Sequence, residues 1–191
     1  MPTLNTKDLI TIVRKGQLAT KVSGAIGSYI NKTITEVTSD MLMGITEIPD
    51  YAFHGGYAGD GYTSLTSVTI PDSVRSIGAY AFSYCINLTS IIIPDSVRSI
   101  GAYAFCGCTS LTSITIPKSV TSMDTYCIFA YCTNLTSVIM LPTTPPSLSG
   151  DVIFMGANSL EQIIVPKGCG DAYKAADGWS SYASKIVEAD E

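Results

Sequence analysis

The sequence predicts a solenoid: a right-handed stack of about 23-residue rungs with a parallel β-sheet on one face, short second-wall segments and a C-terminal cap. Three observations predict it. Closely similar segments begin at Leu65, Leu88 and Leu111, a constant spacing of 23 residues. Each segment opens with alternating apolar and polar residues, which favours a strand. No segment has enough apolar residues to close a core alone, so the segments must stack on one another.

The opening of each repeat, LTSVTIP in the first, predicts one strand per rung. Leu65, Val68 and Ile70 should point into the core, while Ser67 and Thr69 point outward. A second apolar group should line the opposite wall of the solenoid, at Val74, Ile77, Ala81 and Phe82. Stacked rungs would then form a parallel sheet along the rod.

The repeat extends in both directions from the three regular segments. Further starts occur at Leu135 and Leu160, where small insertions explain the drift from the regular spacing. In the other direction, residues 45–53 match the second-wall segment of the following rung, so a diverged first rung is expected. The glycine-rich stretch HGGYAGDGYTS then inserts extra residues after Phe53, and it should form an exposed loop.

These boundaries divide the chain into three parts: an N-terminal cap or attachment segment at 1–30, a repeat solenoid at 31–168 and a C-terminal cap at 169–191. The N-terminal part includes a possible helix at residues 7–15. It could cover the first rung or attach the rod to another structure.

The C-terminal cap should begin with a short helix. Asp171 is placed to cap its start and Gly178 to end it, and Trp179 and Tyr182 would then shield the last rung. Before the cap, the run LPTTPP at residues 141–146 should replace a second-wall strand, because proline cannot donate a ladder hydrogen bond.

The stretch LTSVTIPDSVRSIGAYAFSYC resembles the repeat of the BspA-like leucine-rich-repeat family, also called the Treponema pallidum type. The resemblance covers roughly residues 34–166, and it implies a leucine-rich-repeat solenoid. The asparagine or cysteine that many leucine-rich repeats carry after the strand is replaced here, at Asp72-Ser73, Asp95-Ser96 and Lys118-Ser119. The generic asparagine ladder should therefore be absent, as fits the BspA-like branch.

Composition and charge narrow the functional classes. The chain has a net charge of −5 and its few Lys and Arg are scattered, so a nucleic-acid partner is not expected. No apolar run is long enough to span a bilayer, and Leu9 to Val13 is too short for a signal peptide. His54 is the only histidine, and the motifs of common hydrolases, P-loops and zinc proteases are missing. Neither an enzyme nor a cofactor is predicted.

Three of the six cysteines follow the repeat. Cys85, Cys108 and Cys132 each come three residues after a phenylalanine, so we expect a column of small buried side chains. Side chains in register point in parallel, which is poor geometry for a disulfide. Cys106 and Cys127 lie off the column, and the cysteine spacings do not match a zinc site, so no metal is predicted.

Two regular surfaces are candidates for ligand binding. A row of tyrosines precedes the phenylalanine of successive rungs, at Tyr51, Tyr80, Tyr103 and Tyr126. Such a row could bind a sugar ring or a protein side chain, but the sequence favours the alternative that it only covers the edge of the rod. The outer face of the strands presents one column of serines and a second column of Thr69, Ile92, Thr115 and Ile139. The serines are Ser67, Ser90, Ser113 and Ser137.

The insertion after Phe53 is a third candidate contact site, with His54 and Tyr57, because loops on a rigid scaffold often carry specificity.

Proteins similar to this family are commonly surface or secreted adhesins, so the resemblance implies a non-catalytic module that binds a host protein or polysaccharide. The alternative is a structural or assembly component of a cell-surface or phage-like particle, attached through residues 1–30.

Overall fold

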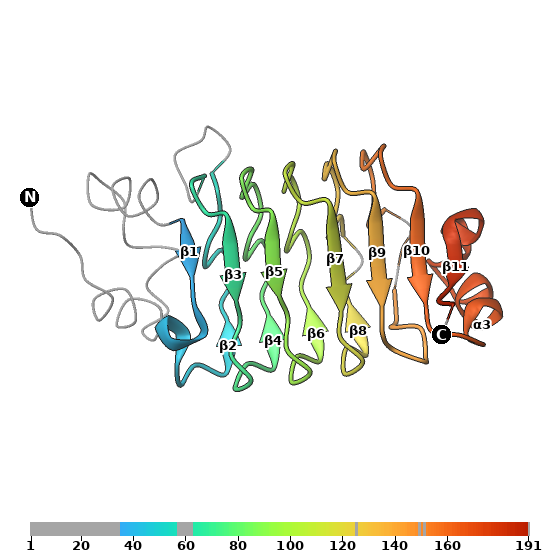
Figure 1. Ribbon diagram of the computed structural model, residues 1–191, viewed down its shortest axis with the longest axis horizontal. Coiled ribbons are helices and arrows are strands. Elements are labelled where there is room, and N and C mark those ends of the chain that lie inside the picture. The colour runs from blue at the N-terminus through green and yellow to red at the C-terminus, as the bar shows by residue number, and fades with distance from the viewer. Residues whose placement is uncertain (1–34, 57–62, 125, 149, 151, 191) are drawn as a thin grey trace, which may run out of the picture.

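The computed structural model describes residues 35–56, 63–124, 126–148, 150 and 152–190. Within these ranges the chain is a solenoid whose strands follow one another along the rod in sequence order (Figure 1). The predicted N-terminal segment with its possible helix, and Tyr57 of the insertion, lie outside the described residues. The predicted stack of rungs is confirmed.

The broad face of the solenoid carries the longer strands. They are β1 (Glu36–Val37), β3 (Ser67–Thr69), β5 (Ser90–Ile92), β7 (Ser113–Ile116), β9 (Ser137–Met140), β10 (Gln162–Val165) and β11 (Ile186–Glu188). All pair in parallel, and equivalent residues of successive repeats lie opposite each other, as Ser67 and Ser90 do. Hydrogen-bonded pairing runs in two parts, β1-β3-β5 and β7-β9-β10-β11, with β5 and β7 neighbours along the rod (Figure 1).

The second wall is a sheet of two-residue strands: β2 (Glu47–Ile48), β4 (Ser76–Ile77), β6 (Ser99–Ile100) and β8 (Ser122–Met123). The pairing of β2 with β4 confirms the diverged first rung. After β8 the wall continues only as an isolated bridge between Ser122 and Ser147. The proline-rich run just before Ser147 accounts for this end of the sheet, as predicted, because proline lacks the N–H that a ladder needs.

The core consists of columns of identical or similar residues, one from each rung. The leucines that precede the strands are fully buried, at Leu65, Leu88, Leu111 and Leu135. Phenylalanines of the turn stack on one another with centroids 5.2 to 5.6 Å apart and nearly parallel rings, at Phe53, Phe82, Phe105, Phe129 and Phe154. The stack continues for the whole length of the described solenoid because each ring fills the space above the next.

The C-terminal cap contains α3 (Gly170–Ala175), the 3-10 helix η2 (Ser180–Lys185) and β11. Trp179 and Tyr173 are fully buried, and the Trp179 indole N–H donates to the Pro146 carbonyl at 2.9 Å. Tyr182 packs edge-on against Phe154, the last ring of the stack. These contacts confirm that Trp179 and Tyr182 shield the final rung.

The start of the cap helix differs from the prediction. Cys169, not Asp171, is the N-cap residue, and the helix already ends at Ala175, before Gly178. The carboxylate at this end of the helix comes from Glu188, which accepts hydrogen bonds from the backbone N–H groups of Gly168 and Gly170 at 2.9 and 2.7 Å. These bonds lower the pKa of Glu188 below its usual range. A residue on the adjacent strand therefore replaces the local cap.

Removing one ring from the phenylalanine stack should destabilise the whole rod. Phe105→Ala leaves a cavity between two neighbouring rings, and the expected loss is about 3–5 kcal/mol in the free energy of unfolding. Urea unfolding followed by circular dichroism measures it. Tyr126→Ala is the matched control, because Tyr126 is exposed, and its effect should stay within about 0.5 kcal/mol. Equal effects of the two substitutions would contradict the stacked core.

The hydrogen bonds of Glu188 should make the cap sensitive to acid. Because folding lowers the pKa of Glu188, its stabilising contribution is present at neutral pH and disappears as pH falls through the lowered pKa. Glu188→Gln should therefore destabilise the cap at pH 7, and the difference from the parent should shrink in acid. Fluorescence of Trp179, the single tryptophan, reports unfolding of the cap. Glu161→Gln, at an exposed glutamate one strand away, is the control and should change neither the stability of the cap at pH 7 nor its dependence on pH.

Candidate binding surfaces

The outer residues of the broad face form straight columns. Ser90, Ser113 and Thr115 are exposed, Ser67 and Thr69 are half-buried, and Ile92 is 59% exposed. Strand spacing separates equivalent side chains by about 4.8 Å. These six of the predicted strand-face residues therefore lie on one surface, as the sequence indicates. The predicted tyrosines occupy a different part of each rung, after the second-wall strands.

Polar side chains at the rung corners bind the backbone of the preceding rung. The hydroxyls of Thr66, Thr89 and Thr136 donate to main-chain carbonyls one rung earlier at 2.8 to 3.1 Å. The side-chain amides of Asn87 and Asn134 donate in the same way at 2.6 and 2.8 Å. The generic asparagine ladder after the strand is expected to be absent, and these two asparagines bridge rungs at a different place, the corner before the strand. Their recurrence directly before Leu88 and Leu135 was the available signal.

The tyrosine row is a face-to-face stack. Rings of Tyr51 and Tyr80 lie 4.8 Å apart and those of Tyr80 and Tyr103 lie 4.6 Å apart, with planes within 7° of parallel. All three residues have a φ near +57°, a left-handed conformation that is uncommon outside glycine. Because the ring faces cover one another, the inner rings can offer a ligand mainly their edges and hydroxyl groups.

Tyr126 does not belong to this row, which corrects the prediction. The N–H of Tyr103 bonds to the carbonyl of Tyr126, as the N–H of Tyr80 bonds to that of Ala102, so the residue equivalent to Tyr103 is Cys127. Cys127 has the same left-handed φ of 52°. Tyr126 is displaced because its rung is one residue longer, and its side chain is 59% exposed.

A second aromatic column alternates tyrosine with glycine, at Tyr84, Gly107, Tyr131 and Gly156. All four have positive φ. A Cβ atom on Gly107 would lie 2.8 Å from the ring of Tyr84, and one on Gly156 would lie 2.7 Å from the ring of Tyr131. Each tyrosine ring thus lies over the bare backbone of the next rung, and the glycine is required to admit it. The sequence signal is the alternation of Y-C with G-C and G-A after the phenylalanines.

His54 lies between the two aromatic columns. Its ring centroid is 5.7 Å from that of Tyr51 and 6.1 Å from that of Tyr84. Its Nδ1 accepts a hydrogen bond from the N–H of Gly56 at 2.9 Å. The structure therefore brings His54 close to the predicted tyrosine surface and fixes the orientation of its ring.

The predicted cysteine column is present and fully buried. The thiols of Cys85, Cys108 and Cys132 donate to the carbonyls of Phe53, Phe82 and Phe105, each on the preceding turn, at 2.9 to 3.2 Å. Burial raises the pKa of all three thiols, that of Cys132 to about 12. All six cysteines are free. The column is therefore part of the packing.

Cys106 and Cys127 form a small separate cluster with Ala130, against which Tyr103 packs. Burial is the main reason that the pKa of Cys106 rises to about 11. The proximity of Cys127 is the first cause that raises the pKa of Tyr103, followed by burial. The Cys106 thiol thus remains protonated at neutral pH beside the end of the tyrosine row.

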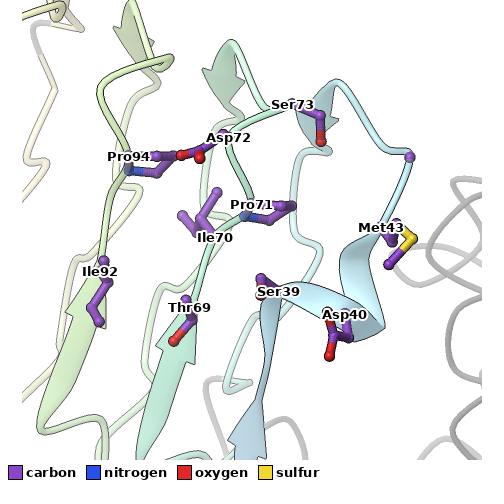
Figure 2. Close-up of a pocket in the computed structure, with 11 residues that line it drawn as sticks. Ser39, Asp40, Met43, Thr69, Ile70, Pro71, Asp72, Ser73, Ile92 and Pro94 are labelled. Carbon is purple, nitrogen blue, oxygen red and sulfur yellow. The ribbon is translucent and has the colours of Figure 1, made fainter.

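An open groove of about 520 Å³ lies at the first rungs of the solenoid. Figure 2 shows it between the 3-10 helix η1 (Ser39–Leu42) and the chain that leaves β3 and β5. Two of the predicted strand-face residues, Thr69 and Ile92, line it, together with residues of the corners and of η1: Ser39, Asp40, Met43, Gly44, Ile70, Pro71, Asp72, Ser73 and Pro94. The repeat pattern does not predict this groove, because η1 belongs to the diverged rung and has no counterpart in the repeats.

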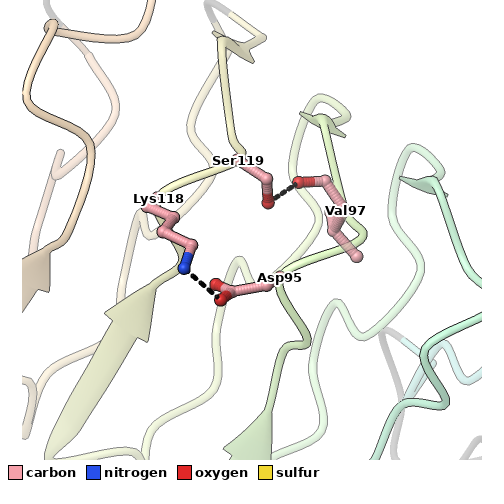
Figure 3. A network of polar contacts seen from close by, with 4 residues as sticks. All are labelled: Asp95, Val97, Lys118 and Ser119. Atoms are coloured by element: carbon pink, nitrogen blue, oxygen red, sulfur yellow. Dashed lines mark hydrogen bonds and ion pairs between the residues drawn. The ribbon is translucent and has the colours of Figure 1, made fainter.

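One corner away from the groove, a charged pair bridges two rungs (Figure 3). The Lys118 ammonium lies 3.1 Å from the Asp95 carboxylate, and beside it the Ser119 hydroxyl donates to the Val97 carbonyl at 2.6 Å. Asp72, Asp95 and Lys118 occupy equivalent positions of successive repeats. Because the third repeat has Lys118 where the first two have aspartate, the charge of Asp95 is neutralised. Asp72, in contrast, has the acid Asp95 at the next position of its column.

Two further features concern the described ranges alone. Among these residues no group of three or more His, Cys, Asp or Glu side chains is arranged to hold a metal ion. Likewise, none of the helices in this part of the chain is both long and apolar enough to cross a membrane.

The stacked parallel strands, the short second wall and the buried leucine and phenylalanine columns define a leucine-rich-repeat solenoid. Sequence comparison gives the particular family. The family model described as BspA type leucine rich repeat region matches residues 46–176 in six copies. The chain belongs to this BspA-type leucine-rich-repeat family, which confirms the resemblance found in the repeat.

Solved structures agree with this assignment. A leucine-rich cell surface protein of Faecalibacterium prausnitzii A2-165 is 27% identical, with a TM-score of 0.64 over 76% of this chain and 35% of that chain. The leucine-rich repeat protein of T. pallidum is also 27% identical, with a TM-score of 0.60 over 81% of this chain and 68% of that chain. The chain thus spans about a third of the first protein. None of the curated proteins compared matches it.

The pneumococcal vaccine antigen PcpA is similar in fold alone. It is 20% identical, with a TM-score of 0.54 over 69% of this chain and 30% of that chain.

Burial predicts a clear order of thiol reactivity. Cys169 is the single cysteine of the six that is not buried, and alkylation needs both access and a thiolate. Native protein treated with iodoacetamide at pH 8 should therefore be modified first at Cys169, at least about tenfold faster than elsewhere. Peptide mass spectrometry over a time course measures the rates, and urea-unfolded protein is the control in which all six should react. Equally fast modification of Cys108 in the native protein would contradict the buried column.

Proposed function

We propose that this protein is a non-catalytic binding module that contacts a protein or polysaccharide ligand through its broad strand face. The proposal includes a place at the bacterial cell surface or in the secreted fraction. Leucine-rich-repeat solenoids in general use extended, repeated surfaces to bind partners. What supports the proposal in this chain is the composition of that surface.

The observation that carries the proposal is a neutral, regular and partly apolar face. Over the four central rungs the two outward columns contain only serine, threonine and isoleucine: Ser67, Ser90, Ser113, Ser137, Thr69, Ile92, Thr115 and Ile139. Hydroxyl groups recur there at about 4.8 Å, and exposed Ile92 supplies apolar area. Such a face can dock an extended or repetitive ligand without first displacing tightly hydrated charges.

Support for a surface location comes from similarity. The Faecalibacterium prausnitzii relative is a leucine-rich cell surface protein. By the same similarity, we propose that the ligand of this chain is a host protein or a glycan. The stacked tyrosines Tyr80 and Tyr103, with His54 beside them, offer hydroxyl edges as a second contact surface of the same module.

A ligand screen with charge variants tests the proposal. Purified protein is presented to immobilised matrix proteins and to a glycan array, and binding is quantified by surface plasmon resonance. Ser90→Lys with Ser113→Lys places two charges in the centre of the broad face and should weaken binding at least about tenfold, because a buried unpaired charge is costly.

The matched control adds the same two charges on the second wall, by Thr46→Lys with Thr121→Lys at exposed positions. This variant should bind like the parent. A ligand whose binding survives the strand-face charges would contradict the proposed surface. A panel without any ligand would contradict the binding role and favour the assembly role through residues 1–30.

A further inference from the structure

We propose that the groove beside η1 is a docking site for a segment of a partner protein that carries a lysine or arginine next to aliphatic side chains. The inference rests on the proposed function, because it names the partner chemistry for one end of the same broad face. It is argued from what lines the groove: exposed apolar side chains and two carboxylates that have no cationic partner among the described residues.

The apolar part of the groove is unusually open to solvent. Met43, the residue that follows η1, is 57% exposed, and Ile92 from β5 is 59% exposed. Figure 2 shows them on opposite sides of the groove, with Pro71 between them. A partner that inserts an aliphatic side chain between them removes apolar surface on both sides from water, which is the main source of affinity at such a contact.

The charged part of the groove is acidic and uncompensated. Asp40 and Asp72 are the only charged side chains among the described residues that line it, and both are exposed. The one ion pair among the described residues joins Asp95 to Lys118, so neither groove carboxylate has a cationic partner. The equivalent residue of the next rung, Asp95, is already paired with Lys118. A lysine or arginine of a ligand would therefore find two carboxylates available.

These two features select the chemistry of the occupant. A neutral polysaccharide offers neither a cation nor an aliphatic side chain, and nucleic acids and acidic glycans would be repelled by the carboxylates. A peptide segment with a basic residue among aliphatic ones supplies both. A volume of about 520 Å³ suits a few side chains, because small binding sites in proteins span about 300–1,000 Å³.

The experiment uses the full chain and a fluorescein-labelled probe peptide, Gly-Leu-Ile-Lys-Val-Leu-Gly, in fluorescence anisotropy at low salt. Two control peptides replace the lysine by glutamate, or the leucines, isoleucine and valine by serine. The probe should bind at least about tenfold more tightly than either control, because each control lacks one of the two contacts. Amide shifts of the ¹⁵N-labelled protein should change at residues 39–44, 69–73 and 92–94.

Variants of the protein then test the lining residues. Asp40→Asn with Asp72→Asn should weaken probe binding about fivefold and remove most of its salt dependence. Ile92→Ser should weaken it by a similar factor through lost apolar contact. Asp95→Asn, at the equivalent position one rung along and outside the groove, is the matched control and should bind like the parent. Equal binding of all variants, or no preference among the three peptides, would overturn the proposal.

The same binding experiment tests a segment of this chain as the occupant, because residues 9–15, LITIVRK, combine aliphatic and basic side chains. If that segment fills the groove, Arg14→Ser with Lys15→Ser in the full chain should raise the affinity for the probe about tenfold. That result would overturn docking of a separate protein. The probe peptide could fail to bind the groove while Ser90→Lys with Ser113→Lys still abolishes binding of a ligand found in the screen. That result would overturn the groove proposal and leave the proposed function intact, so the two failures are distinguishable.

Discussion

The structure depends on one constraint: each rung must lie in register on the rung before it. Parallel pairing places Ser67 opposite Ser90 and Ser113 opposite Ser137, so a residue type that recurs in the sequence becomes a column in space. A column of leucines or phenylalanines closes the core, whereas a column of serines forms the outer face. No rung is complete by itself, and the two ends require covers of another kind, of which Trp179 and Tyr173 are the described example.

Each column also solves a local difficulty that stacking creates. Turn carbonyls that face the interior would cost free energy if they lacked a donor, and the buried cysteine thiols supply one. Tyrosine at a left-handed φ is strained, but its ring gains the face of the neighbouring ring. Where tyrosines alternate with Gly107 and Gly156, the ring lies on backbone instead. Repetition makes each solution apply to several rungs at once.

Periodicity explains why much of this could be predicted, and its local failures explain the rest. The strand face and the buried columns follow from the spacing alone. Tyr126 was assigned to the wrong column because one extra residue in its rung moved Cys127 into the left-handed position. Glu188 replaced Asp171 at the cap helix through a contact between distant residues, which no local pattern encodes. The groove depends on η1, which occurs once and therefore leaves no repeat to recognise.

Residues 70–82 and 93–105 are the same thirteen amino acids, IPDSVRSIGAYAF. Two consecutive rungs therefore present the same second wall and turn to their neighbours, and each fits the contacts of the other. A deletion or duplication of one of them would remove or add one unit of 23 residues, after which the flanking columns could close again in register. The η1 helix at one end and the tryptophan-bearing cap at the other would be inherited unchanged. Rung number, and with it the length of the outer face, is thus a trait that can evolve in whole steps without redesign of the ends.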